Sequence, residues 1–453
     1  MVLNQLYIDN IFCEDYISCL NKNYICEDKL SVSCVDNCFV VPFQSTPTGS
    51  PYGNGGCYDD QLNYVKSSGT YAENLLVEPE SVNDAECDYV DETVIYAGYF
   101  IKHWGHFIVD FLPRMWWPAL HYNGEKIIYL KNGDAAIDGN FMEMLKIFGI
   151  DPDKIKAIEK STKFKKVIIP ELALQRPDKI YREALLVRDR IVKNAAQCCK
   201  YDKVYLTRRS FPKAIDSEFG EEQVEEFFRD NGFKVLSPEL LPVAEQVALF
   251  SSCPKIACLS GTIPHNIFFG NSDTELIIVN KLTRINTTQL MLNQLCGANV
   301  TFIDAFIQLL PVSPGAGPFW MLINDNMRKY AQDHAMVLAE KPIDYTDILI
   351  RYFLVYNRIY TYPLEKGGVI MGSPLPLDEG AERKDIFSYY RNKLGNINID
   401  ASVRVDSGEN TKKLERRLKK ENALKKCRRK CKDILRSLKR RLILKKEQIC
   451  VEA

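Results

Sequence analysis

The sequence contains no run of about 18 uncharged apolar residues, which is the length that a membrane-spanning helix needs. Its most apolar candidate, residues 348–364, is interrupted by Arg351 and Arg358 and is better interpreted as a packed helix or strand. The first residues, Met-Val-Leu-Asn-Gln-Leu, also lack the basic and apolar regions of a secretory signal. We therefore expect a cytoplasmic protein.

The cysteines lack the paired spacing that is typical of a structural zinc site. Fifteen of them are scattered along 453 residues, and their number is odd. Neither Cys198 with Cys199 nor Cys427 with Cys431 is matched by a second pair at a suitable spacing. In a chain far larger than disulfide-stapled secreted domains, this pattern favours reduced, buried thiols and no bound metal.

The chain also lacks net charge, but the balance conceals a basic C-terminal segment. Residues 412–446 hold 18 lysines and arginines against three acids, so the remainder is acidic. Leucines and cysteines recur there at three- and four-residue steps, which predicts a basic amphipathic helix within 411–453. Three roles stay open: a peripheral anchor of residues 411–446 on anionic lipid at the inner face of the plasma membrane, a self-associating coil that forms a homo-oligomer, and a solvated or nucleic-acid-binding arm.

What the sequence does contain is a repeated alternation of strands and helices. The predicted elements lie at 126–130, 140–148, 165–170 and 178–197, and then at 203–207, 221–231, 233–236, 241–253, 255–259, 264–269 and 274–279. This alternation predicts an α/β fold with two doubly wound, Rossmann-like domains that face a cleft. The predicted parts are a β-containing segment (1–85), an N-terminal Rossmann-like domain (86–200), a C-terminal Rossmann-like domain (201–315), a helical extension (316–365), a linker (366–410) and the basic helix (411–453).

Residues 98–117 gather two of the five histidines and three of the four tryptophans of the chain. If the segment is helical, His106 and Asp110 lie at i and i+4 on one face, where the carboxylate can orient and stabilise the imidazole. Gly105 leaves room for a ligand, and Pro113 ends or kinks the helix. The grouping predicts a functional site, and the alternative is an aromatic-rich core helix with a satisfied His–Asp pair.

Two loops that follow predicted strands suit an anionic ligand. Arg208 and Arg209 stand at the end of one strand, where guanidinium groups can bind phosphate oxygens in pairs; the alternative is a solvated surface pair. The loop 259–266 offers a glycine, hydroxyls and the amides that open a helix, and its alternative is a satisfied helix cap. Its candidate residues for a donor or phosphate are Gly261, Thr262, His265 and Asn266.

A metal-dependent nucleotide-sugar enzyme usually carries Asp-x-Asp after an apolar strand, and this chain lacks that arrangement. Its single match, Asp151-Pro-Asp153, follows a predicted helix and is interpreted as a turn. Diphosphate charge would then be neutralised by Arg208, Arg209 and helix dipoles. Lys102 and His103 are further candidates for contacts with donor phosphates or an acceptor.

These residues together resemble glycosyltransferase family 61, whose bacterial branch is associated with capsular and cell-surface polysaccharide synthesis. The resemblance runs from about 90 to 285. It rests on Gly98-Tyr-Phe-x3-Trp-Gly-His-x3-Asp-x-Leu-x-Arg, on Val-Tyr-Leu-Thr-Arg-Arg, on Gly232-Phe, Pro238-Glu and Glu245-Gln, and on Gly261-x3-His-Asn.

The resemblance implies a GT-B architecture and an inverting, metal-independent transfer from a nucleotide sugar to a glycan or lipid-linked glycan, with no other cofactor. It places His106 and Asp110 on the family's His-x3-Asp positions, in an acceptor and catalytic domain over 86–200. The resemblance assigns nucleotide-sugar binding to the domain over 201–315. Whether Asp110 orients His106 or itself takes the proton stays open. A catalytically inactive glycan- or nucleotide-binding partner is the alternative, and nucleic acid is not an expected partner because the body is acidic.

Overall fold

The structure, a computed structural model, divides the chain into two compact units. The first comprises residues 1–341 and 351–396, and the second 342–350 and 397–453. The features discussed below lie in the first unit. The predicted linker at 366–410 and the basic helix at 411–453 lie outside the described residues. The structure describes residues 4–9, 13–45, 53–69, 76–77, 87–131, 133–284, 286–310, 312–339 and 343–361.

One large sheet has seven strands in the order β5-β4-β3-β9-β6-β7-β8. Strands β6, β7, β8 and β9 run parallel, as predicted for the part of the chain after residue 90. Strand β3 is antiparallel to both β4 and β9, so the sheet is mixed. The bounds are β3 (Val32–Ser45), β4 (Gly53–Tyr58), β5 (Leu76–Val77), β6 (Asp88–Phe100), β7 (Lys126–Lys131), β8 (Ile155–Ile158) and β9 (Thr162–Pro170).

The other large sheet has six strands, all parallel, in the order β1-β17-β16-β15-β12-β14. Counted from β12 along the chain, its order is 2-1-3-4-5, the doubly wound arrangement whose direction reverses between the first and third strands. The loops after β12 and β15 therefore flank the switch point. The bounds are β1 (Asn4–Tyr7), β12 (Lys203–Leu206), β14 (Lys234–Leu236), β15 (Lys255–Leu259), β16 (Glu275–Asn280) and β17 (Asn299–Asp304).

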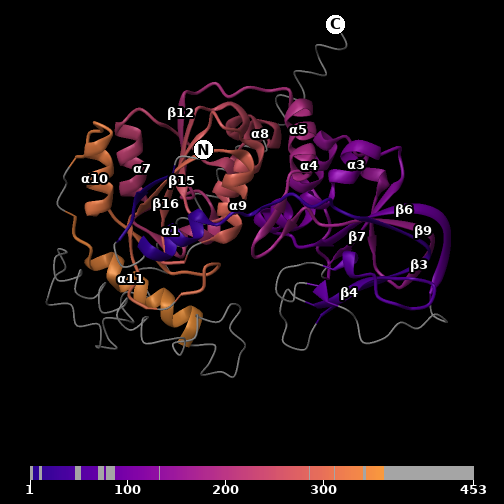
Figure 1. Ribbon diagram of the computed structural model, residues 1–453. Helices are drawn as coiled ribbons and strands as arrows, with labels where there is room; N and C mark the ends of the chain where they lie inside the picture. The colour runs from indigo at the N-terminus through magenta and orange to yellow at the C-terminus, as the bar shows by residue number, and fades with distance from the viewer. Residues whose placement is uncertain are drawn as a thin grey trace, which may run out of the picture. The chain divides into compact units, whose positions relative to one another are not determined.

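Helices cover both faces of the six-stranded sheet, as Figure 1 shows: α7 and α10 lie on one side of β12, β15 and β16, and α8 and α9 lie on the other. Phe227 and Phe228 of α7 and Tyr330 of α10 join one buried cluster with Tyr205 and Ile277 of the strands. Burying such aromatic faces is the main source of stability for this layer. The bounds are α7 (Glu221–Asp230), α8 (Val243–Ser252), α9 (Thr287–Cys296) and α10 (Asp325–Asp333).

Residues before 86 supply strands to both large sheets, since β1 pairs with β17 and β3 pairs with β9. Two smaller sheets have the orders β10-β11-β2 and β13-β19-β18. Their bounds are β2 (Ile25–Cys26), β10 (Leu174–Gln175), β11 (Lys179–Tyr181), β13 (Glu218–Phe219), β18 (Phe306–Ile307) and β19 (Phe319–Met321). The other α-helices are α1 (Cys13–Asn21), α2 (Trp104–His106), α3 (Trp116–His121), α4 (Gly139–Phe148), α5 (Ala184–Ala195), α6 (Pro212–Ile215) and α11 (Thr346–Tyr356).

The alternating elements predicted between 126 and 279 are confirmed within a few residues, but two predictions are wrong. The helix predicted over 178–197 begins only at Ala184, because residues 179–181 form β11 and pair with β10 and β2. The helical extension predicted from Phe319 starts instead with strand β19, which pairs with β13 and β18. Among the described residues no helix is long and apolar enough to cross a membrane.

Arg114, the last residue of the first motif, is a buried structural link. It is 1% exposed, and its guanidinium donates to the carbonyl oxygens of Ser67 and Pro170 at 2.6 Å and of Gly69 at 2.7 Å. Gly98, with φ of +91°, lies directly against it, because a Cβ there would sit 3.0 Å from the Arg114 Nε. The motif therefore requires glycine at 98 both for its backbone conformation and for space.

We predict that Gly98→Ala destabilises the protein more than Gly124→Ala does. Both glycines have φ of +91°, but a Cβ at Gly124 meets nothing within 4 Å. The backbone strain alone should cost about 1–2 kcal/mol in either variant, and the contact with Arg114 should add about 1–3 kcal/mol in Gly98→Ala. Urea unfolding of the two variants measures the difference, and equal losses of stability would contradict the packing role of Gly98.

Candidate active site

The segment that carries the first motif is helical, but its geometry changes along its length. It starts at α2, whose N-cap His103 is extended and accepts a bond from the His106 backbone N–H at 3.4 Å. It then widens into the π-helical turn η4 (Phe107–Phe111) and tightens into the 3-10 turn η5 (Leu112–Arg114), with Pro113 in its first turn. π-Turns of this kind are often found at functional sites because they re-aim side chains.

The carboxylate of Asp110 is engaged on both oxygens. Its Oδ2 accepts a hydrogen bond from the His106 Nδ1 at 2.7 Å, and its Oδ1 accepts one from the Arg176 Nη2 at 2.8 Å. Asp110 is 5% exposed, whereas His106 is 30% exposed. A buried carboxylate that accepts hydrogen bonds from a guanidinium and an imidazole fixes the orientation of the ring that it binds.

The first motif packs directly against the loop that follows β15. The Trp104 Nε1 donates to the Asn266 Oδ1 at 2.9 Å. A Cβ on Gly105 would lie 3.2 Å from the Thr262 Oγ1. The space beside Gly105, predicted to admit a ligand, is therefore occupied by the hydroxyl of Thr262, and two motifs far apart in the sequence meet here.

His265 is buried beside this contact in a defined tautomer. Gln289 donates through its Nε2 to the carbonyl oxygen of Pro264 at 3.0 Å and to the Asn293 Oδ1 at 2.7 Å, so its Oε1 accepts from the His265 Nδ1 at 2.7 Å. The lone pair of His265 therefore lies on Nε2. Burial lowers the pKa of His265 to about 4, although the hydrogen bond with Gln289 opposes this. The ring is neutral at pH 7.

His103 reports which cations surround the motif. Protein around the ring lowers its pKa to about 4 even though the residue is exposed at the surface. The charges of Lys213 and Arg208, and those of His106 and His265 when these are protonated, act in the same direction. The electrostatic effect of a charge on a titratable group falls off with distance, so these charged groups lie near His103. The predicted residues His103, His106, His265 and Arg208 therefore belong to one neighbourhood, and Lys213 joins them.

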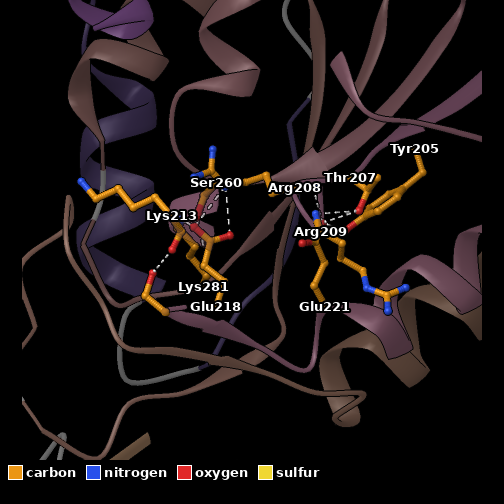
Figure 2. Close-up of polar contacts among 10 residues, drawn as sticks. Tyr205, Thr207, Arg208, Arg209, Lys213, Glu218, Glu221, Ser260 and Lys281 are labelled. Carbon is orange, nitrogen blue, oxygen red and sulfur yellow. Dashed lines mark hydrogen bonds and ion pairs between the residues drawn. The ribbon is translucent and has the colours of Figure 1, made fainter. Parts of the chain in front are cut away.

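The two adjacent arginines point to different partners (Figure 2). The Arg208 Nε donates to both carboxylate oxygens of Glu218, at 3.0 and 2.9 Å. The Arg209 Nη1 donates to the Glu225 Oε1 of α7 at 3.3 Å, and Arg209 is 49% exposed. Successive side chains at a strand end project to opposite sides. Only Arg208 faces the loop at Ser260.

Lys281 is a cation of this site that the sequence reasoning missed. It follows β16 and is 5% exposed; its Nζ donates to the Glu218 Oε1 at 2.7 Å. Its backbone N–H donates to the Ser260 Oγ at 3.2 Å, and its Nζ lies 3.7 Å from where a Cβ on Gly261 would be. Carboxyl ends of neighbouring parallel strands meet at one edge, so polar residues just after each strand were the signal that could have identified it.

Glu221 accepts a hydrogen bond from the backbone of Arg208 and fixes the start of the loop that follows β12. One of its oxygens accepts from the Arg208 backbone N–H at 2.8 Å and from the hydroxyls of Tyr205 and Thr207 at 3.1 Å. Burial raises the pKa of Glu221 to about 7, although the three hydrogen bonds oppose this. The carboxyl is therefore only partly ionised at neutral pH and offsets less than one positive charge.

Comparison with known proteins accounts for this combination of motifs. Residues 104–277 match the family model described as Glycosyltransferase 61. The match supports glycosyltransferase family 61. It starts at Trp104 and ends within β16, so it contains the His106–Asp110 pair, Arg208 and the loop at Gly261. No curated protein matches the chain.

Two other predicted positions have their polar groups engaged elsewhere, and Asp151 lies in the turn that the sequence predicts. Within the family 61 segment, the amide of Asn266 is occupied, since its Nδ2 donates to the carbonyl oxygen of Ile263 at 2.8 Å and its Oδ1 accepts from Trp104. Just outside the segment, the Lys102 Nζ pairs with exposed Asp138 at 2.6 Å. Asp151 caps a short turn by accepting from the Asp153 backbone N–H at 3.0 Å.

One large pocket lies away from the motifs described above. It has a volume of about 770 Å³ and is lined by residues at the amino ends of the parallel strands, among them Lys203, Lys255 and Glu275. A much smaller recess of about 20 Å³, large enough for one water, adjoins Ser260 and Gly261. Ligands of doubly wound sheets bind at the carboxyl edge, so the smaller recess is on the relevant side.

We predict that His265 makes stability pH-dependent below neutrality. Because its pKa is lowered to about 4, the unfolded state binds more protons than the folded state between about pH 6.5 and 4, and stability falls as pH falls through that window. Between pH 7 and 4.5 this group should cost about 2.5 kcal/mol. Thermal unfolding across this range should show a shallower slope in His265→Asn, whereas His121→Asn, at an exposed position, should leave the slope unchanged.

Proposed function

We propose that the protein is an inverting, metal-independent glycosyltransferase that moves a sugar from a nucleotide-sugar donor to a hydroxyl of a glycan or lipid-linked glycan. One observation carries the proposal. His106, oriented by Asp110 and Arg176, lies where the first motif packs against the loop that follows β15. The proposed base and the loop proposed to bind the donor meet there, as a single displacement requires.

His106 is the better candidate for the base. Both carboxylate oxygens of Asp110 already accept hydrogen bonds, from His106 and from Arg176, so neither oxygen is placed to accept from a substrate hydroxyl. Donation by the His106 Nδ1 leaves the lone pair on Nε2, for which no partner exists in the described part of the chain. The acceptor oxygen would attack the anomeric carbon, its proton would pass to Nε2, and the bond to the diphosphate would break with its electrons on the leaving group.

The basic side chains at the carboxyl edge of the six-stranded sheet would stabilise the departing diphosphate. Arg208, Lys213 and Lys281 supply three positive charges near the switch point. The helix η8 (Ile263–Phe269) has seven residues of 3-10 geometry and carries Pro264 in its first turn, so we assign it little of the charge compensation that its N-terminus was predicted to give. Arg208 and the Gly261 backbone are the donor contacts that we retain.

We also propose a GT-B arrangement, which the strand order of the six-stranded sheet supports more strongly than the mixed sheet does. A role in capsular or cell-surface polysaccharide synthesis rests on the family resemblance alone. Cytoplasmic location, membrane attachment through 411–446 and self-association are proposals that rest on the sequence. No cofactor other than the substrate nucleotide sugar enters the proposed reaction.

The test is nucleotide release from UDP-, GDP- and CMP-sugars, with and without EDTA and with membrane glycolipid extract as acceptor. We predict donor-specific release that EDTA does not change. His106→Ala should lower the rate at least about 100-fold, because a positioned base contributes at least that much. Asp110→Asn, which keeps the shape of the side chain but not its charge, should lower the rate by a comparable factor.

His334→Ala is the matched control, since His334 lines the pocket at the amino ends of the strands and its ring centroid lies 4.3 Å from that of Tyr330. It should retain activity. Full activity in His106→Ala would exclude His106 as the base, and release from no donor would exclude the transferase and favour a binding partner. Loss of release with EDTA would contradict the metal-independent step.

A further inference from the structure

Three charged side chains lie together beside the loop at Ser260 and Gly261: Glu218 and Lys281 are buried, and Arg208 is 17% exposed. Glu218 is 3% exposed and accepts hydrogen bonds from the Arg208 Nε and, at 2.7 Å, from the Lys281 Nζ (Figure 2). The three residues come from separate parts of the chain: the end of β12, the strand β13 and the end of β16. Burying charged groups is costly unless they are paired, and here two cations share one anion.

Glu218 determines how Arg208 is presented. Both of its oxygens bind the Nε of Arg208, and no described residue hydrogen-bonds the Nη1 or Nη2. The ring of Phe211 lies 5.2 Å from the Arg208 Cζ and holds the group on another side. Because the guanidinium is rigid and planar, anchoring it through Nε presents the two Nη groups as a fork. Such a fork matches two phosphate oxygens.

Lys281 determines the net charge that remains. Without it, Glu218 would neutralise Arg208, and the buried cluster would offer no net attraction to an anion. With it, the charges of Arg208, Lys281 and Glu218 sum to one positive charge. Lys281 is also close to the loop, because its Nζ lies 3.7 Å from the Cβ position of Gly261 and its backbone N–H binds the Ser260 Oγ.

We propose that Glu218 and Lys281 are positioning residues of the donor site: Glu218 aims the Arg208 fork, and Lys281 offsets Glu218, so that the site selects a nucleoside diphosphate over a monophosphate. The inference rests on the proposed function, because it deepens the account of the same donor site. Neither residue need touch the sugar or the acceptor.

Binding of UDP, GDP and CDP, each compared with its monophosphate, tests the proposal by isothermal titration calorimetry on the full chain. For the nucleobase that wild type binds most tightly, Lys281→Met should weaken binding of the nucleoside diphosphate about tenfold and binding of the monophosphate by less than about threefold. The reason is that the lost charge acts more strongly on the more highly charged ligand. Lys281→Arg should remain within about threefold of wild type for both.

Two further variants separate this role from a structural one. Lys281→Met leaves Glu218 with one partner and will lower the melting temperature. Lys281→Met combined with Glu218→Gln removes both charges and leaves the net charge of the cluster unchanged. Because glutamine keeps an oxygen that can accept from the Arg208 Nε, this variant should recover most of the diphosphate affinity. Lys255→Met is the matched control, because Lys255 pairs with Glu275 at 2.7 Å at the amino edge of the same sheet; it should leave both affinities unchanged.

The outcomes are distinguishable. Suppose that wild type binds a diphosphate. If Lys281→Met binds it equally well, or if its affinities for the diphosphate and the monophosphate fall by the same factor, the positioning role is overturned while the proposed function stands. If the double variant binds as weakly as Lys281→Met, the charge argument is overturned. If wild type binds no diphosphate and releases nucleotide from no donor, the proposed function fails together with the inference; if it binds no diphosphate but releases nucleotide from a donor, the inference alone fails.

Discussion

The candidate site depends on one buried carboxylate. Asp110 joins the first motif to Arg176, which precedes the short strand β11, and through its other oxygen it sets the ring of His106. A charge this deeply buried is stable only while both partners remain in place. The same two contacts that stabilise the carboxylate therefore define the direction of the His106 lone pair, so local stability and proposed chemistry share one cause.

The remaining parts of the site follow from how two distant segments fit together. Glycine at 105 lets the Thr262 hydroxyl approach the backbone, and the Trp104 indole binds the Asn266 amide. The loop at 260–266 in turn sits at the switch point of a 2-1-3-4-5 sheet, where strand ends bring cations together. The proposed base and the proposed diphosphate site are therefore adjacent because of topology, and each is held by buried polar contacts.

Much of this could be predicted from the sequence where the information is local. The strands and helices between 203 and 279 are short and bounded by turn residues, and the His106–Asp110 pairing follows from helical spacing. Arg176, and the pairing of Lys281 with Glu218, could not be predicted, because each cation lies 66 or 63 residues from its carboxylate partner. The division between Arg208 and Arg209 was predictable from strand alternation, since only one of two successive side chains can face the loop.

The most direct test of the account is the protonation of the His106 ring, measured by ¹⁵N NMR on histidine-labelled protein at pH 7 and assigned by comparison with His106→Gln. The account predicts a protonated Nδ1, bound to Asp110, and an unprotonated Nε2; Asp110→Asn should disturb this tautomer. A ring with its proton on Nε2, or one protonated on both nitrogens throughout the range in which the enzyme is active, would contradict it, because neither form could accept a proton from a sugar hydroxyl.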